Sequence, residues 1–381
     1  MTEPVRIFAG IPAVNRTLYH RIRFSVGDPA ALIEEPSGST LILRDIEMKR
    51  ARQQARANEV RCPADFTPKD GLSGDRETAT AQSLAECLVQ KGIEEVEVDR
   101  TLPQSFAHEL ALRSIKCHYN PNLGVTERRA KDAQEIEWLK HAQSVTAATI
   151  TRACQLVARA EASAKGELLH DGTPLTSERL RGMIDVWLLE QNFSNPGSIV
   201  AGGPQAADCH HHGHGPLLTE QPIIIDIFPC DKATLYNGDC TRTVVHGQIP
   251  PLVSEMHAAV VAANAAGTAA TKAGVTGEQV HRATIAVLEE KGFRADRTPG
   301  AVEGDRPAMP HGTGHGIGLE VHEPPLLDFK GPELVIGDAL TIEPALYSTA
   351  VGGVRVEDLV VVTKHGCESL NADLPTGLDW K

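Results

Sequence analysis

Apolar residues follow two different spacings in the first part of the chain, residues 1 to about 122. Short apolar runs, typical of strands, alternate with longer stretches in which apolar residues recur every three or four positions, as in helices. The runs are Ala31–Ile33, Thr40–Leu43 and Glu95–Val98, and the helical stretches are Ala79–Lys91 and Phe106–Leu112. This alternation predicts an α/β domain, and its sequence holds no convincing cluster of catalytic residue types.

A polar segment, Asn122–Arg129, separates this domain from a long stretch with helical periodicity. Six apolar side chains of that stretch project within about 60° of one direction when successive residues are placed 100° apart. They are Ile136, Leu139, Ala142, Ile150, Cys154 and Val157. The helix therefore packs one face on a core, and we expect one domain at residues 1–126 and a second at 127–381.

The second part of the chain combines further helices with antiparallel strands. Helices are predicted at Ser177–Gln191, Leu252–Lys272 and Thr276–Lys291. The last one begins with a capping box, Thr-Gly-Glu-Gln, and ends at Gly292. Strands are predicted at Pro222–Phe228 and Gly238–Val245, which form a hairpin, and at Ala339–Glu343 and Gly353–Thr363. This order predicts an α+β layer structure and not a series of parallel βαβ units.

Length and composition agree with a soluble globular protein of two domains. The chain has 381 residues, of which 41% are hydrophobic and 23% charged. The formal net charge of −13 repels phosphate groups, so nucleic acid and anionic membrane surfaces are excluded as partners. Neutral or amine-bearing substrates and divalent cations suit this charge.

The start of the chain and its cysteines favour a cytoplasmic location. The N-terminal residues lack a secretion-signal pattern, and no apolar run approaches the roughly 18–20 residues of a membrane helix. The 8 cysteines form no CxxC pair. In a chain of this size without a signal peptide, we expect free thiols and not a disulfide framework.

Four acidic residues interrupt or end apolar strands of the second domain. They are Asp226, Asp239, Glu343 and Glu357. A buried carboxylate requires a counter-charge, and the nearby cations are chiefly Arg242 and Arg355. Two divalent cations would balance four carboxylates, which favours a dinuclear centre. Carboxylates with one imidazole suit Mn²⁺, Co²⁺, Fe²⁺ or Zn²⁺.

A glycine-rich segment with three histidines, residues 311–323, supplies the imidazoles. Its glycines alternate with other residues, which suits an extended backbone in close contact with its neighbours. The segment lacks the GxGxxG spacing of a dinucleotide loop and does not open a helix. His311, His315 and His322 are therefore candidates for metal binding and proton transfer.

In these motifs the chain resembles the pita-bread-fold metallopeptidases, the family of prolidase, Xaa-Pro aminopeptidase and methionine aminopeptidase, with creatinase as a metal-free relative. The family's metal ligands occur in the order Asp, Asp, His, Glu, Glu, which Asp226, Asp239, His315, Glu343 and Glu357 match. Gly238–Thr243, Thr341–Pro344 and Val354–Asp358 are similar to the family's second aspartate motif and its two glutamate motifs. The resemblance covers residues 127–365.

The resemblance implies a fold and an activity. The fold is α+β, with a C-terminal pita-bread domain (creatinase/aminopeptidase-like) after a smaller creatinase-like α/β domain. The activity is metal-dependent hydrolysis of the Xaa-Pro bond of dipeptides, or of the N-terminal Xaa-Pro bond of short peptides, by a metal-bridging hydroxide. Two divalent ions are implied, Mn²⁺ first, with Co²⁺, Zn²⁺ or Fe²⁺ as alternatives. A homodimer is also implied, in which the N-terminal domain limits access to short peptides.

The resemblance also implies roles for individual residues. Glu343 is both a ligand and the acceptor of a proton from the metal-bound water, while His322 orients substrate or relays a proton. His311 helps to hold substrate, and His210 is the first choice for a further pocket histidine in the run 209–214. His211 or His212 is expected to be an exposed loop residue.

Arg355 has two interpretations, which are not exclusive. On a strand it shares a face with Glu357 and so borders the site. By resemblance it contacts the substrate carboxylate, and on charge alone it neutralises the surplus acid around the metals.

The chain departs from the family in the spacing of its two aspartates. Asp226 and Asp239 are separated by two residues more than usual, which lengthens the loop Pro229–Asn237 but preserves the parity of the strands. Both aspartates should still face one side, and Asp231 is a poor alternative ligand because it lies in the loop.

Three functions follow from these observations. A proline-specific peptidase is the first, and a same-fold hydrolase or lyase acting on a non-peptide small molecule is the second. A binding protein with an inactive version of the fold is disfavoured because all five ligand types are kept. Methionine aminopeptidase is disfavoured by the N-terminal domain and by the pair His311 and His322.

Overall fold

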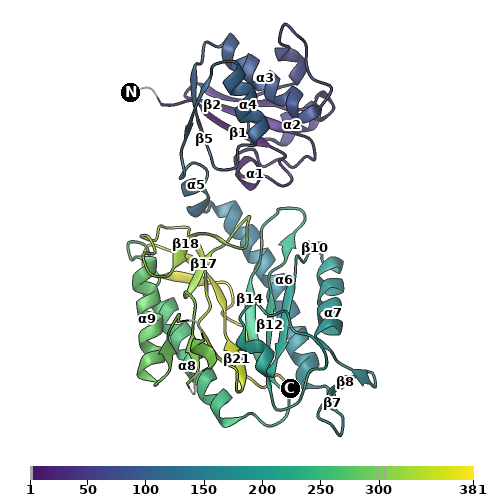
Figure 1. Ribbon diagram of the computed structural model, residues 1–381, viewed down its shortest axis with the longest axis vertical. Helices are drawn as coiled ribbons and strands as arrows, with labels where there is room; N and C mark the ends of the chain where they lie inside the picture. The colour runs from purple at the N-terminus through teal and green to yellow at the C-terminus, as the bar shows by residue number, and fades with distance from the viewer. Residues whose placement is uncertain (1–2, 299, 304–305) are drawn as a thin grey trace. The chain divides into compact units, whose positions relative to one another are not determined.

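The computed structural model describes residues 3–298, 300–303 and 306–381, which fold into two compact units (Figure 1). The first unit extends to Arg128 and the second begins at Arg129. The division falls inside the polar segment from which the domain boundary was predicted. The short helix α5 (Thr126–Arg129) lies at this division.

The N-terminal unit is an α/β domain, as predicted, built on one six-stranded sheet in the order β4-β3-β2-β1-β5-β6. Its strands are β1 (Arg6–Gly10), β2 (Ala30–Glu35), β3 (Gly38–Ile42), β4 (Glu59–Arg61), β5 (Glu95–Val98) and β6 (Lys116–Tyr119). Its helices are α1 (Arg16–Ile22), α2 (Met48–Gln54), α3 (Arg76–Gln90) and α4 (Gln104–Leu112). Strand side chains alternate between two cores, since Ile7 packs with α3 and α4 whereas Phe8 packs with α1.

Four long helices of the C-terminal unit confirm the predicted ones. They are α6 (Ala133–Ala158), α7 (Ser177–Glu190), α8 (Pro251–Ala270) and α9 (Gly277–Glu290). Capping boxes start two of them: Asp132 with Glu135 at α6, and Thr276 with Gln279 at α9, where the box was predicted. Within the described residues, no helix is both long and apolar enough to cross a membrane.

The strands of the C-terminal unit form several small sheets. One sheet has the strand order β11-β12-β14 and consists of β11 (Ser198–Gly202), β12 (Pro222–Ile227) and β14 (Cys240–Val245). A second sheet has the strand order β15-β16-β20-β21 and consists of β15 (Arg294–Ala295), β16 (Ala308–Met309), β20 (Ala345–Ser348) and β21 (Gly352–Arg355). A third sheet has the strand order β18-β17-β19-β22-β23 and consists of β18 (Glu323–Leu327), β17 (Gly314–Gly316), β19 (Ala339–Ile342), β22 (Asp358–Val362) and β23 (Cys367–Ser369). Smaller pairings join β10 (Phe193–Ser194) to β13 (Cys230–Asp231), and β7 (Glu161–Ala162), β8 (Leu168–His170) and β9 (Thr173–Pro174) to one another.

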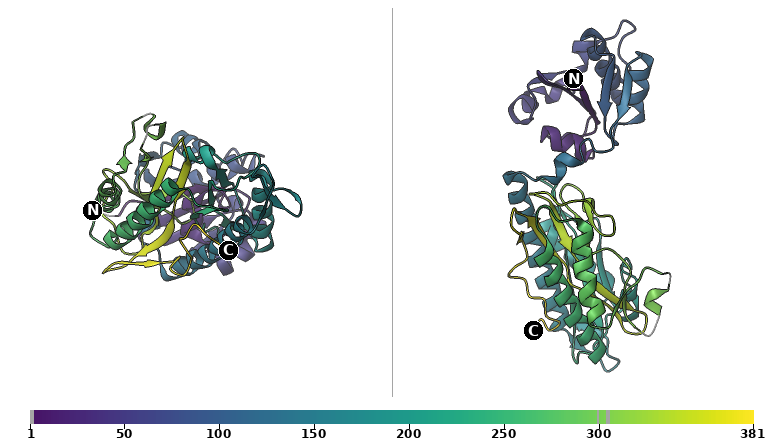
Figure 2. Two further views of the ribbon diagram at one scale, coloured as in Figure 1. Left: turned by 90° about the horizontal axis from the view of Figure 1, so that it is seen from below. Right: turned by 90° about the vertical axis from the view of Figure 1, so that its left-hand side faces the viewer.

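Helices cover the outer faces of these sheets and leave the inner faces for the site. Ile223 and Ile225 of β12 pack into one core with α6 and α7, whereas Ile224 packs against Tyr347 of β20 on the opposite face. A separate core joins α8 and α9, which run side by side (Figure 2), to β16, β20 and β21. Asp226 alternates with Ile225, so it faces away from α6 and α7.

One predicted strand is wrong. The segment 353–363 is two strands, β21 and β22, which belong to different sheets, and Val356 and Glu357 lie in the break between them. The break is held by β14, because the amide of Glu357 donates to the carbonyl oxygen of Thr241 at 3.1 Å. An apolar run cannot reveal such a break, which arises from pairing with a distant strand.

Candidate functional site

All nine residues predicted from sequence as site residues line one cavity of about 560 Å³ in the C-terminal unit. They are His210, Asp226, Asp239, His311, His315, His322, Glu343, Arg355 and Glu357. Its other lining residues are mostly apolar, and include Ile199, Phe228, Val321 and Leu326.

The antiparallel pairing of β12 and β14 brings the two aspartates together. Asp226 lies opposite Thr241, so their side chains share a face. Asp239 precedes Thr241 by two residues and therefore points to the same face. The longer connection thus keeps both aspartates on the cavity side. Asp231 is bonded within that connection, to the amide of Ala233, and does not line the cavity.

Helix α6 fixes the backbone of Asp239. The buried side chain of Gln143 donates to the carbonyl oxygen of Asp239 at 2.7 Å and accepts from its amide at 2.9 Å. Gly238 allows this approach, since a Cβ there would lie 2.1 Å from Oγ1 of Thr146. Gln143 was not identified from the sequence, although a glutamine on the apolar face of a helix is a signal for such a bond.

His315 faces the carboxylates through Nε2. This atom lies 3.5 Å from Oε1 of Glu343 and 3.8 Å from Oδ2 of Asp239. Ligand atoms of Asp239, His315 and Glu357 all lie within 4.8 Å of one another. Two atoms that each lie about 2.0–2.3 Å from one cation are roughly 3–4 Å apart. The 3.5 Å and 3.8 Å distances from Nε2 of His315 therefore fit a shared ion.

The protonation of His315 supports a cation between it and the acids. Its Nδ1 lies 3.1 Å from the carbonyl oxygen of Gly316, so Nδ1 carries a hydrogen and Nε2 is left with a lone pair. Burial, with His322 adding to it, lowers the pKa of His315 to about 4, and the ring is therefore neutral. A neutral lone pair that faces carboxylates is an arrangement suited to metal binding.

The carboxylates themselves are destabilised by their surroundings. Burial raises the pKa of Asp239, Glu343 and Glu357, that of Glu343 to about 7, and the neighbouring acids raise them further. Oδ1 of Asp226 is buried and accepts no hydrogen bond from the described residues. An oxygen-rich donor set with one imidazole and an unpartnered carboxylate oxygen fits divalent metal ions.

Arg355 is bound on all three nitrogens by the protein. Nη2 donates to Oδ2 of Asp226 at 2.7 Å, Nη1 to the hydroxyl of Tyr347 at 2.8 Å, and Nε to Oγ1 of Thr241 at 3.1 Å. Arg355 and Glu357 do not share a strand, contrary to the prediction, because the chain leaves β21 after Arg355 and Glu357 lies in the break before β22. Arg355 nevertheless borders the cavity, where it serves as counter-charge to Asp226.

The histidines differ in what their nitrogens already contact. Nδ1 of His311 lies 2.8 Å from the carbonyl oxygen of Gly312, and Nε2 lies 3.1 Å from the hydroxyl of Tyr347. His322 is exposed, with its ring centroid 4.3 Å from that of His315. His212, one of the two histidines of which one was expected to be an exposed loop residue, is exposed but also lines the cavity. His210 and His322 are therefore the histidines most open to a substrate.

A buried ion pair holds the loop that carries His322. The side chains of Lys131 and Glu323 are each 3% exposed, and Nζ lies 3.3 Å from Oε2. Gly318 packs on this pair, since a Cβ there would lie 2.8 Å from Cε of Lys131. The side chain of Asn237 donates to the carbonyl oxygen of Gly318 at 2.8 Å, so the longer connection and the histidine loop are joined.

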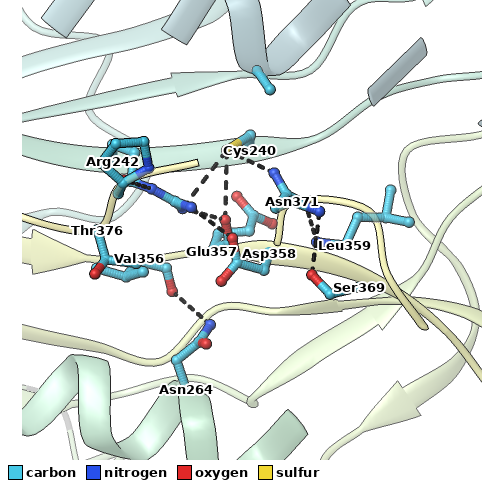
Figure 3. Close-up of polar contacts among 12 residues, drawn as sticks. Cys240, Arg242, Asn264, Val356, Glu357, Asp358, Leu359, Ser369, Asn371 and Thr376 are labelled. Atoms are coloured by element: carbon cyan, nitrogen blue, oxygen red, sulfur yellow. Dashed lines mark hydrogen bonds and ion pairs between the residues drawn. The ribbon is translucent and has the colours of Figure 1, made fainter. Parts of the chain in front are cut away.

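Arg242 supports Glu357 from behind (Figure 3). Its Nη1 donates to the carbonyl oxygen of Glu357 at 2.7 Å, and Nη2 to Oδ1 of Asp358 at 2.7 Å. Cys240 and Asn371 pack beside it, and Nδ2 of Asn371 donates to Sγ of Cys240 at 3.5 Å. On the other side, Oγ1 of Thr241 donates to Oε2 of Glu357 at 2.7 Å.

Comparison with known proteins gives a consistent picture. Metallopeptidase family M24 matches residues 137–364. The Streptomyces coelicolor protein "Xaa-Pro aminopeptidase 2" is 33% identical over 273 residues, which cover 66% of this chain and 56% of that protein. The Mycobacterium tuberculosis protein "Probable dipeptidase PepE" is 36% identical over 175 residues, or 45% of this chain and 43% of that protein. The chain thus spans about half the length of these curated relatives.

Two solved structures share the fold over almost the whole chain. An X-Pro aminopeptidase from Thermotoga maritima has a TM-score of 0.78 at 23% identity and covers 98% of this chain and 97% of its own. A prolidase from Pyrococcus horikoshii has a TM-score of 0.77 at 20% identity, with 98% and 95% covered. These likenesses show the predicted fold, in which a smaller α/β domain precedes an α+β domain.

Proposed function

The chain belongs to metallopeptidase family M24, and on this premise we propose that it hydrolyses Xaa-Pro bonds of dipeptides, or of short peptides at their N-terminus, with two divalent metal ions. The observation that carries the proposal is the lone pair of neutral His315 facing buried carboxylates in a cavity of about 560 Å³. The names of the relatives, Xaa-Pro aminopeptidase and dipeptidase, support the same reaction.

Five residues would hold the metals: Asp226, Asp239, His315, Glu343 and Glu357. Four carboxylates and two divalent ions balance in formal charge, and the oxygen-rich set favours Mn²⁺, with Co²⁺, Zn²⁺ and Fe²⁺ as alternatives. When bound, such ions supply Lewis acidity and lower the pKa of a water molecule.

The remaining residues would bind substrate and move protons. Glu343 accepts a proton at its carboxylate, while His322 and His210 present free imidazole edges to the substrate. His311 was expected to hold substrate, but its two ring nitrogens already contact Gly312 and Tyr347, so we propose that it keeps the cavity wall in place. The apolar wall of the cavity suits the pyrrolidine ring of proline, whose burial there contributes to substrate binding through the hydrophobic effect.

Assembly, metal and location are part of the same proposal. We propose a homodimer with Mn²⁺ in a cytoplasmic environment. All 8 cysteines are free thiols, which supports a reducing compartment.

The proposal is tested by product analysis with mass spectrometry. Mn²⁺-loaded and chelator-treated protein receive Ala-Pro, Ala-Pro-Ala and Ala-Ala-Ala in parallel. Metal-dependent cleavage before proline alone is expected, and the preferred length distinguishes a dipeptidase from an aminopeptidase. Absence of cleavage by protein that holds two metals contradicts the peptidase function and favours the alternative, a non-peptide small-molecule substrate.

Arg355 gives a sharper prediction. The guanidinium of Arg355 is bound to Asp226, Thr241 and Tyr347. We therefore expect Arg355→Lys to lower turnover of Ala-Pro and of Ala-Pro-Ala equally. The expected loss is about 10–100-fold, the usual effect of removing a group that orients a metal ligand. Steady-state kinetics on both peptides measure this factor. A larger loss on the dipeptide would instead indicate that Arg355 binds the substrate carboxylate.

A further inference from the structure

A second group of metal-binding atoms lies beside the catalytic cavity. One ligand atom each from Asp208, Cys209 and His210 lies within 4.8 Å of the others. Cys209 and His210 line the cavity, and none of the three belongs to the five ligands assigned above. The donors are sulfur, nitrogen and oxygen, unlike the oxygen-rich centre.

The backbone holds these three neighbours in place. Asp208 is the C-cap of the short 3₁₀ helix η3 (Gly203–Ala207), and its Oδ1 accepts from the backbone amide of His210 at 3.0 Å. The carbonyl oxygen of Cys209 accepts from Nη1 of Arg355 at 3.4 Å. In the described part of the chain, the imidazole of His210 makes no hydrogen bond, so its nitrogens are free for a ligand.

The two groups differ in the cations they prefer. Carboxylates and a single imidazole accept Mn²⁺, whereas a thiolate with an imidazole selects thiophilic ions such as Zn²⁺ and Cd²⁺. Burial raises the pKa of Cys209, so the free protein carries a thiol there. Binding breaks the S–H bond, forms a sulfur–metal bond and releases one proton to water.

We propose that Cys209, His210 and Asp208 form a separate site for a thiophilic divalent cation on the wall of the cavity. Three protein ligands leave a fourth position for water. Occupation of the site engages His210 and narrows the cavity, so the ion inhibits the enzyme. The inhibition rests on the proposed peptidase function, but the binding does not.

The binding is tested without any peptide. Mn²⁺-loaded protein is titrated with Cd²⁺ while the ultraviolet charge-transfer band of a cadmium–thiolate bond is recorded. One equivalent is expected to saturate the band in the wild type. We expect Cys209→Ser to abolish the band. We expect His210→Gln to raise the Kd for Cd²⁺ at least about tenfold, because removing even a group that only orients a metal ligand weakens metal binding by this factor.

Cys62→Ser is the matched control, because Cys62 is also a half-buried free thiol but lies in the N-terminal unit. It should keep the band. A band that persists in Cys209→Ser, or no band in the wild type, overturns the proposal whether or not the protein cleaves peptides. If the protein is a peptidase, Cd²⁺ should inhibit Cys209→Ser less than the wild type, so the ratio of activity with Cd²⁺ to activity without it should rise towards one. A ratio equal to that of the wild type overturns the proposed inhibition by the bound ion.

Discussion

Asp239→Asn is expected to remove metal binding and to lower peptidase activity roughly 10³-fold or more, the equivalent of several kcal/mol of transition-state stabilisation. Asp239 is buried beside His315 and Glu357, and an amide supplies neither its charge nor its second anionic oxygen. Metal content by mass spectrometry and turnover of Ala-Pro measure the two effects. Full activity with bound metal would contradict the assignment of Asp239 as a ligand.

The same variant separates loss of metal from loss of fold. Burial and the neighbouring acids, Glu357 first, raise the pKa of Asp239, so the folded metal-free chain binds its proton more tightly than the unfolded chain. The stability of metal-free wild type therefore falls as pH rises above the unfolded value of about 4. Asparagine does not titrate, so metal-free Asp239→Asn should be at least as stable at pH 8 and should lack this part of the pH dependence.

Thermal unfolding from pH 5 to 8, with chelator present, checks this expectation. Glu290→Gln is the control, because Glu290 is exposed at the end of α9 and does not line the cavity. It should behave like the wild type with and without metal. A metal-free Asp239→Asn protein that melts far below the metal-free wild type would show that its inactivity reflects a damaged fold.

Arg242→Met is expected to lower the free energy of unfolding by about 3–5 kcal/mol, the usual cost of removing one partner of a buried charge pair. The Arg242 side chain is 0% exposed and its partner Asp358 is 14% exposed. Nε also donates to the carbonyl oxygen of Pro375 at 2.8 Å, so the substitution leaves several buried acceptors without a donor. Denaturant unfolding measures the loss.

Arg282→Met is the matched control for this substitution. Arg282 pairs with Glu278 one turn away on the surface of α9, where its side chain is 61% exposed. Its replacement should leave the unfolding free energy almost unchanged, because exposed ion pairs contribute little. In the Arg242→Met background, Asp358→Asn should recover part of the loss by removing the unpaired charge. Equal stability of the two methionine variants would contradict a supporting role for Arg242 behind Glu357.

Local signals in the sequence predicted the long helices of the chain. The helices α6 to α9 each have a continuous apolar face, and the capping box at Thr276 specifies where α9 begins. Such signals depend on residues three or four positions apart, which every helix brings together in the same way. The hairpin of β12 and β14 followed from two apolar runs and a polar connection.

The strand predicted at 353–363 shows where local reasoning ends. Its apolar residues fit one strand, yet β21 pairs with β20 and β22 pairs with β19. The break places Glu357 at the cavity, and contacts from Arg242 and Thr241, more than 100 positions away in sequence, hold it there. No spacing within the segment encodes those contacts.

Gln143 and Tyr347 were missed for the same reason. Neither belongs to a motif, and each acquires its role from a distant partner: Gln143 from the backbone of Asp239, and Tyr347 from Arg355 and His311. The interpretation of Arg355 also needed its partners, because a guanidinium near a cavity can bind either substrate or protein. Its contacts with Asp226 and Tyr347 favour the protein.

The sequence by itself determined the family resemblance, the helices and the set of nine candidate residues, because ligand types at characteristic spacings and apolar periodicity are local properties. Only the tertiary structure decided which of these residues face one another, which nitrogen of His315 is free, and that Arg355 is bound to Asp226. These features depend on side chains from separate strands that meet in a buried space, where every polar group requires a partner. That requirement is satisfied by long-range packing, and spacing along the chain does not specify it.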